Sequence, residues 1–183
     1  MSGNNIGASI YSDGKQIAPM FPEYPYLCKC QICKSFYWLN DKTEIDLTNI
    51  SDNIHQYSAR FLKIDEYFEA LQVMNSLDSS HERFMRFQIY WLFNDRIRSG
   101  KEIFSNEEDE VLYISNIQFL LELLDENEIE DQITQAEVYR NMGLFDDAIR
   151  YLNQIDNKNY QWVIDRIKEK ALAGEKEVFL LNP

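Results

Sequence analysis

The residues best suited to chemistry in this chain are three closely spaced cysteines, Cys28, Cys30 and Cys33. Cys30 and Cys33 form a Cys-x-x-Cys pair, and this spacing lets a tight turn direct two sulfurs toward one cation. A zinc ion held there would lower the pKa of the thiols and keep the turn closed. The sequence therefore predicts that Cys30 and Cys33 bind zinc, and Cys28 could be a third ligand.

A structural zinc ion takes four ligands, and the chain has no second Cys-x-x-Cys pair to supply them. Its two histidines, His55 and His81, fall within or at the start of expected helices. A surface or capping role is more usual for a histidine in such a position. The fourth ligand therefore stays open between a histidine and a carboxylate.

Two other uses of the cysteines compete with zinc binding, namely unreactive reduced thiols and redox chemistry. A thioredoxin-like redox pair opens a helix that follows a strand within a βαβ unit. Here residues 36–39 are aromatic and favour a strand, and no βαβ pattern follows. We therefore expect a structural metal staple. A thiol-based redox sensor or enzyme that uses Cys28, Cys30 and Cys33 is the alternative.

The elements that position these cysteines change character near residue 40. Three of the four prolines precede it, at positions 19, 22 and 25, and the fourth is residue 183. Ser12–Lys15 has turn-forming residues, and short strands are expected at Leu27 and at residues 36–39, on either side of the cysteine turn. We therefore expect a zinc-ribbon-like cysteine knuckle over residues 1–40 and a helical domain over residues 41–183.

Beyond residue 40, apolar residues recur at three- and four-residue spacings that are typical of amphipathic helices. A weak pattern covers residues 50–64, and clearer ones predict helices over residues 65–77, 81–98, 105–124, 128–142, 145–155 and 159–173. Capping boxes at Ser79–Glu82 and Ser105–Glu108 would start two of them. The helix over residues 81–98 is apolar almost all round, so we expect it to be central. The short connections predict antiparallel helical hairpins and a mainly α fold.

Charge and hydropathy exclude two classes of partner. The chain has 183 residues and a net charge of −13. Residues 1–40 contain three lysines and two acidic residues, a balance of +1, so the remainder carries 15 basic and 29 acidic residues, a balance of −14. Such a surface repels nucleic acid.

No run approaches the roughly 20 apolar residues of a membrane span, and no leader pattern is present. We expect a soluble, cytoplasmic protein.

Residues 136–152 resemble the core of a tetratricopeptide repeat. The matching positions are Ala136, Tyr139, Gly143, Phe145, Ala148 and Leu152. Small alanines let two helices approach, and a glycine permits the left-handed turn between them. One repeat cannot bury its own faces, so neighbouring hairpins would have to complete a stack. The resemblance implies protein–protein interaction through a concave helical surface, whereas the simpler reading is one well-packed α-hairpin.

The arrangement as a whole resembles an uncharacterised bacterial family with an N-terminal half zinc ribbon and tetratricopeptide-like helical repeats. The matching stretches are Tyr11–Gly14, Pro19–Pro25, Cys30–Leu39, Tyr90–Arg96 and Ala136–Leu152. This resemblance implies no assigned activity. Cys28 is additional to the family's Cys-x-x-Cys pair.

A second group of polar and aromatic residues lies on and near the central helix. Its members are Arg83, Arg86, Trp91, Asn94, Asp95 and Arg96. An aromatic hollow lined by arginines could bind a peptide carboxylate or another acidic ligand, or make the protein a small-molecule receptor. The simpler interpretation is that Asp95 pairs with Arg98, three residues later, and that such groups bond the ends of neighbouring helices.

No pattern in the sequence predicts a catalytic site. The chain has no Gly-x-Ser-x-Gly elbow, no glycine-rich phosphate loop and no His-Glu-x-x-His motif. The favoured hypothesis is therefore a non-enzymatic interaction or scaffold protein that binds another protein through its helices, with the cysteine knuckle as a structural staple.

Overall fold

The computed structural model describes residues 7–20, 23–39, 59–74 and 77–181. Within these ranges the fold is mainly helical, as the periodicity predicts, and it has six helices. It also contains two small antiparallel β-hairpins. The boundary expected between residues 40 and 41 and most of the helix expected over residues 50–64 lie outside the described ranges. Residues 59–63 are not helical.

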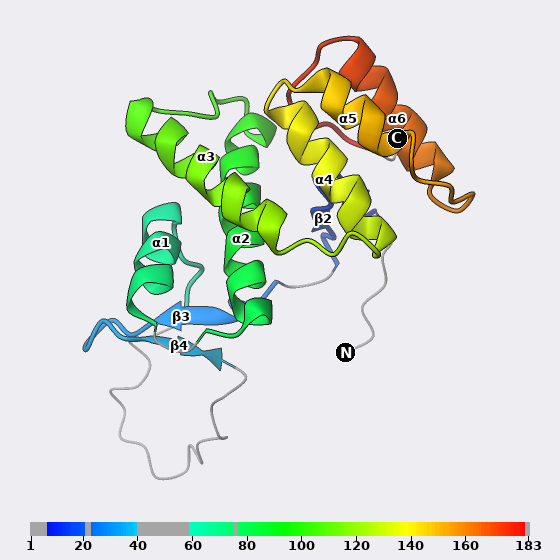
Figure 1. Cartoon of the computed structure of the whole chain (residues 1–183). Coiled ribbons are helices and arrows are strands. Elements are labelled where there is room, and N and C mark those ends of the chain that lie inside the picture. The colour runs from blue at the N-terminus through cyan, green and yellow to red at the C-terminus, as the bar shows by residue number, and fades with distance from the viewer. Residues whose placement is uncertain (1–6, 21–22, 40–58, 75–76, 182–183) are drawn as a thin grey trace. The chain divides into compact units, whose positions relative to one another are not determined.

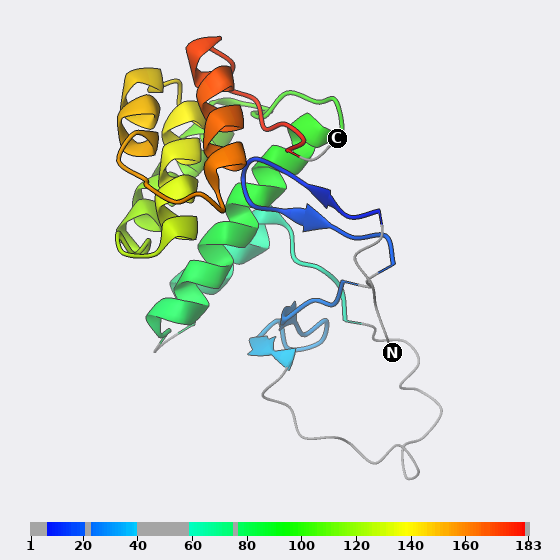
Figure 2. The ribbon, with the colours of Figure 1, turned by 90° about the vertical axis from the view of Figure 1, so that its right-hand side faces the viewer.

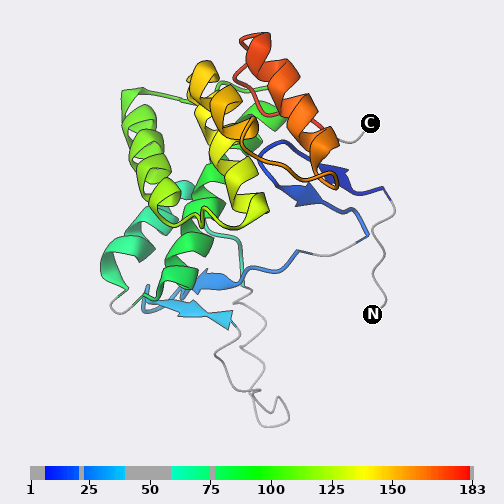
Figure 3. The same ribbon diagram turned by 45° about the vertical axis from the view of Figure 1, so that its right-hand side comes forward.

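The chain forms two compact units, residues 22–77 and residues 1–21 with 78–183. The smaller unit contains strands β3 (Leu27–Lys29) and β4 (Phe36–Trp38) and helix α1 (Ile64–Val73). The strands pair antiparallel, with Leu27 opposite Trp38 and Lys29 opposite Phe36 (Figure 3). This hairpin around the cysteines confirms the prediction.

Helix α1 is tied to the strands and to the chain before it by charged side chains. The Nζ of Lys29 lies 2.5 Å from a carboxylate oxygen of Glu69. At the start of the helix, Glu66 accepts the backbone N–H of Lys63 at 3.0 Å and binds both terminal nitrogens of Arg60, at 2.5 and 2.7 Å. The Arg60 hydrogen bonds lower the pKa of Glu66 to about 2. A carboxylate at this place favours the helix because it satisfies an amide that the first turn leaves without a partner.

The larger unit contains five helices that follow one another through short connections (Figure 1). They are α2 (Ser79–Arg98), α3 (Glu107–Glu122), α4 (Ile129–Asn141), α5 (Phe145–Leu152) and α6 (Gln161–Leu172). Helix α2 packs against α3, and α5 packs against both α4 and α6. None of the helices within the described ranges is long and apolar enough to cross a membrane.

The two predicted capping boxes are wrong by one residue. Asp78, not Ser79, caps α2, and its side chain accepts the backbone N–H of His81 at 2.8 Å. Asn106, not Ser105, caps α3 and accepts the N–H of Asp109 at 2.9 Å. Aspartate and asparagine are at least as good as serine at this position. In both cases the better cap adjoins the predicted serine.

The turn between α4 and α5 brings two alanines into the core. Ala136 and Ala148 are fully buried, one from each helix, so that the two backbones approach closely. Gly143, between the helices, has a φ of +79°, a conformation that side chains disfavour. Leu152 extends the same core toward Ile164 of α6. The predicted helical hairpin is therefore present with the expected small residues at its contact.

Helix α2 is central within the larger unit, as its all-round apolar character predicts. Besides its packing against α3, it reaches α4, where the Tyr90 hydroxyl lies 2.5 Å from Oδ1 of Asn141. It also reaches the N-terminal hairpin, where Nε1 of Trp91 donates to the backbone oxygen of Asp13 at 3.0 Å.

The N-terminal hairpin holds the C-terminal segment. Strands β1 (Ser9–Ile10) and β2 (Gln16–Ile17) flank the predicted turn. The segment after α6 runs beside β1, with the N–H of Leu181 donating to the Ile10 oxygen at 2.8 Å and the N–H of Ser12 donating to the Phe179 oxygen at 2.9 Å (Figure 2). These hydrogen bonds therefore hold the segment after α6 against the N-terminal hairpin.

A fully buried ion pair joins this C-terminal segment to α4. Arg140 donates to both carboxylate oxygens of Glu137, at 2.7 and 2.5 Å, and also to the backbone oxygens of Glu175 and Glu177. Burial raises the pKa of Glu137, and the Arg140 hydrogen bonds oppose that rise. Each member satisfies the other, so loss of one leaves an unpaired buried charge.

We predict that Arg140→Met destabilises the protein by about 3–5 kcal/mol, because Glu137 stays buried without its partner. The double variant Glu137→Leu/Arg140→Met removes both charges and should recover part of that loss. Urea unfolding of the full chain measures both. A double variant at least as unstable as Arg140→Met would contradict this account of the pair.

We further predict that Glu66 makes the smaller unit acid-sensitive. Its pKa is about 2 in the fold and 4.5 in its ordinary state, so its stabilising effect is complete above pH 4.5 and disappears as the pH falls toward 2. The stability difference between the wild type and Glu66→Gln should therefore narrow as the pH falls from about 6 to about 2.5. Asp65→Asn removes one charge from the same first turn of the helix and serves as the control. A pH-independent difference would show that Glu66 does not act through its charge.

Candidate functional site

The cysteine turn between β3 and β4 is closed by its backbone. The N–H of Cys30 donates to the Ser35 oxygen at 2.9 Å, and the N–H of Lys34 donates to the Cys30 oxygen at 3.0 Å. Lys34 takes a φ of +63°, the left-handed conformation that lets the chain reverse within so few residues. Cys30 and Cys33 therefore lie on a fixed turn.

The turn places the thiols of Cys30 and Cys33 near enough that Cys30 contributes to the lowered pKa of Cys33. The Cys33 sulfur is exposed and lies 2.9 Å from the hydroxyl oxygen of Ser35. Chiefly this hydroxyl, with help from the Ser35 backbone and the Cys30 thiol, lowers the pKa of Cys33 to about 7. A large share of Cys33 is then thiolate at neutral pH, the form that binds metals and attacks disulfides.

Cys28 occupies a different environment from this pair. It lies in β3 opposite Tyr37, is only 1% exposed, and directs its sulfur toward the Pro25 oxygen at 3.7 Å. Burial raises the pKa of its thiol, which favours the neutral form. Cys28 thus resembles a small core residue more than a metal ligand.

The histidines do not complete a ligand set among the described residues. His81 lies in the first turn of α2, with its Nδ1 3.1 Å from a carboxylate oxygen of Asp78, in keeping with a surface or capping role. His55 lies outside the described ranges. Across the part of the chain that the structure describes, no three cysteine, histidine or acidic side chains gather as a metal-binding group.

The residues at the turn fit zinc as two ligands of four. Cys30 is partly exposed and Cys33 is exposed on the same turn, and the lowered pKa of Cys33 favours its thiolate. A thiophilic cation bound to both sulfurs would hold the turn closed and displace their protons. The remaining two positions need donors from elsewhere.

The arginines predicted as a ligand surface form internal ion pairs. Arg83 binds Asp131 through two hydrogen bonds of 2.5 Å. Arg86 is buried and pairs with Glu82 at 3.0 Å. Arg96 donates to a carboxylate oxygen of Asp109 at 2.6 Å and to the backbone oxygen of Ile103 at 2.8 Å.

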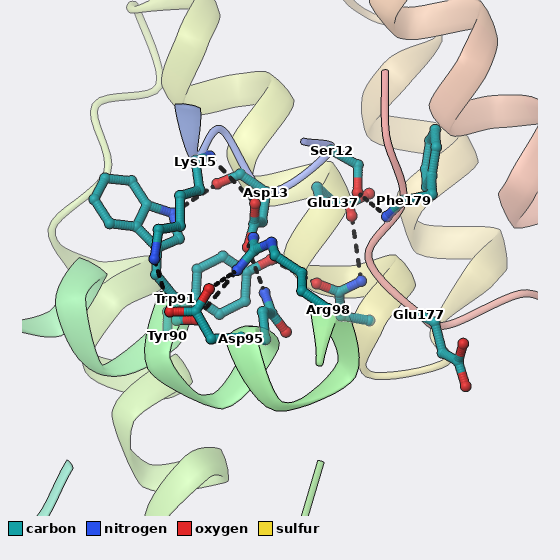
Figure 4. Close-up of polar contacts among 12 residues, drawn as sticks. Ser12, Asp13, Lys15, Tyr90, Trp91, Asp95, Arg98, Glu137, Glu177 and Phe179 are labelled. Atoms are coloured by element: carbon teal, nitrogen blue, oxygen red, sulfur yellow. Dashed lines mark hydrogen bonds and ion pairs between the residues drawn. The ribbon is translucent and has the colours of Figure 1, made fainter. Parts of the chain in front are cut away.

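The other members of that predicted surface gather around Asp13, whose side chain is fully buried (Figure 4). Asn94 donates to its carboxylate at 2.8 Å, and Arg98 donates to the same oxygen. Arg98 also pairs with Asp95 at 2.6 Å, which confirms the expected pair, and Lys15 binds Asp95 from the hairpin at 2.7 Å. These side chains therefore seat the N-terminal turn on α2.

Three residues of these sites were missed at the level of sequence. Ser35 follows Cys33 by two positions, and a hydroxyl so close to a thiol is the signal that could have indicated a lowered pKa. Lys34 carries no such signal, since lysine rarely takes a positive φ. Asp13 was noted only as a turn residue, because its partner Arg98 is 85 residues away.

Comparison with protein-family models, with curated proteins and with solved structures finds no match to this chain.

We predict that Cys33 reacts with iodoacetamide in metal-free protein with a midpoint near pH 7, its pKa being about 7. In Ser35→Ala the loss of the hydroxyl hydrogen bond should move the midpoint toward the ordinary thiol pKa of about 8.5. Cys28 should stay unreacted until the protein unfolds. Alkylation rates against pH, with the modified cysteine identified by mass spectrometry, provide the measurement. A midpoint that Ser35→Ala leaves unchanged would contradict the assigned cause.

Proposed function

We propose that this chain is a non-enzymatic scaffold protein in which Cys30 and Cys33 bind zinc as a structural staple and the helices bind a partner protein. The observation that carries the proposal is the turn that the backbone holds closed, with the partly exposed Cys30 and the exposed Cys33 both on it. A turn fixed in advance spends little conformational entropy when it takes up a metal. The hairpin it closes has only three residues in each strand, so it has much to gain from a crosslink.

The helical array supports the second part of the proposal. The α4–α5 hairpin has the buried alanines and left-handed glycine that the tetratricopeptide resemblance implies, and α6 packs on the same hairpin. Val111 and Ile114, three residues apart on α3, are exposed apolar side chains. Residues at that spacing share a helix face. Apolar side chains on one face suit contact with another protein better than catalysis.

A thiol-based redox role is the second candidate, and the lowered pKa of Cys33 favours it. The two thiols would lose two electrons and two protons to a disulfide such as oxidised glutathione, forming a Cys30–Cys33 disulfide and two glutathione thiols. Zinc and a disulfide compete for the same sulfurs. Thiol trapping after incubation with oxidised glutathione, with and without zinc, separates the two candidates.

The staple predicts zinc binding that depends on Cys30 and Cys33. Full-length protein prepared without added metal and kept reduced should take up zinc, and Cys30→Ala and Cys33→Ala should each lose it. Free zinc at about 100 times the dissociation constant should stabilise the fold by about 2.7 kcal/mol. Metal analysis and thermal unfolding measure the two effects.

Cys28→Ala is the matched control, since it removes a cysteine of the same hairpin whose sulfur is buried. It should retain zinc binding. Absence of bound zinc in the wild type, together with melting that zinc does not change, would show the staple to be wrong. Zinc binding that survives Cys30→Ala would assign the metal to other residues.

A further inference from the structure

We propose that one zinc ion is shared by two copies of this chain, each supplying Cys30 and Cys33. This inference rests on the proposed zinc binding. It adds that a second copy of this chain supplies the remaining ligands from the same turn. It follows from the number of ligands: the turn presents two cysteines, whereas a closed structural zinc site takes four ligands.

Among the described residues, the ligands at the turn number two. Cys30 and Cys33 are accessible, whereas Cys28 is buried in β3 with its sulfur toward the Pro25 oxygen. Within the described ranges no third metal-ligating side chain joins the pair. A closed structural site needs four ligands, and thiolate sets of four are common. A two-fold arrangement of identical turns supplies four sulfurs from one repeated contact.

The position of the pair suits such a contact. The two cysteines occupy a reverse turn between short strands, so the sulfurs are not enclosed by the sheet. Between them lies Ile32, whose apolar side chain is 72% exposed. Two turns meeting at one ion would bring both Ile32 side chains toward the contact and reduce their exposure to water.

Charge also favours this part of the chain as the meeting point. Two molecules of net charge −13 repel each other, but residues 30–36 around the turn contain one lysine and no acidic residue, a balance of +1. A zinc ion with four thiolates carries a net charge of −2. Lys34 follows Cys33 directly and donates to the Gln31 oxygen of the turn at 2.7 Å. One such lysine from each copy balances the charge of the site.

The test is the stoichiometry and mass of the full-length chain under reducing conditions, as zinc is added to metal-free protein. Binding should saturate at half an equivalent of zinc per chain. The mass by light scattering should rise twofold from the 21.8 kDa of one chain. A chelator should reverse both changes. Cys30→Ala and Cys33→Ala should abolish both effects, while Cys28→Ala, His55→Gln and His81→Gln should leave them unchanged.

Cobalt provides a second measurement that does not depend on the mass. The thiolate-to-cobalt charge-transfer absorption per bound ion grows with the number of sulfur ligands. A shared site should show the intensity of a tetrathiolate complex, reached at half an equivalent of cobalt per chain.

The outcomes separate the two proposals. A monomer that binds one equivalent of zinc would overturn the shared site and leave the staple standing, and loss of that binding in Cys28→Ala or His55→Gln would identify the additional ligand. A dimer that forms without zinc, or that persists in Cys30→Ala, would also overturn the shared site. Absence of zinc binding would overturn both proposals.

Discussion

Two backbone hydrogen bonds across residues 30–35 keep the sulfurs of Cys30 and Cys33 together. A Cys-x-x-Cys spacing alone permits two thiols to meet, but a free chain must spend conformational entropy each time they do. Here the turn is already closed, and the left-handed Lys34 completes it. The lowered pKa of Cys33 and the proposed zinc ion both depend on this geometry. A turn that opened would return Cys33 to the behaviour of an ordinary exposed thiol.

Elsewhere, charged side chains form hydrogen bonds and ion pairs that hold distant segments of the chain together. Asp13 seats the N-terminal turn on α2, and Arg140 joins α4 to the C-terminal segment. Both are contacts between parts of the chain that are far apart in sequence, and both place charge where water is excluded. Such pairs contribute little net stability but make a wrong arrangement costly, because each partner left alone is a buried charge. The arginines among them therefore spend their hydrogen bonds on holding parts of the fold together.

The sequence predicted the mainly helical fold, the order and approximate bounds of the six helices within the described ranges, and the hairpin around the cysteines. These features depend on local signals, namely apolar periodicity, glycines and aromatic runs. The predicted cap of α2 is one residue too late and that of α3 one residue too early. Asp78 and Asn106 compete with the neighbouring serines for the same backbone amides.

The rest depends on tertiary contacts that a local pattern cannot contain. Nothing in the spacing of the three cysteines separates Cys28 from the other two, since its burial follows from pairing with β4 and not from its own neighbours. The same holds for the predicted arginine surface. Arg83 finds Asp131 on α4, 48 residues away, and Arg98 finds Asp13 on the N-terminal turn. The pairs of Asp95 with Arg98 and of Glu82 with Arg86 lie at helical spacing, and the first of them was predicted from the sequence.

The central claim is that the closed turn presents Cys30 and Cys33 as the ligands of a zinc ion. X-ray absorption at the zinc edge of the loaded full-length protein reports the atoms that bind the metal. The account predicts sulfur in the innermost shell at about 2.3 Å. A shell made only of nitrogen and oxygen, at about 2.0–2.2 Å, would contradict it.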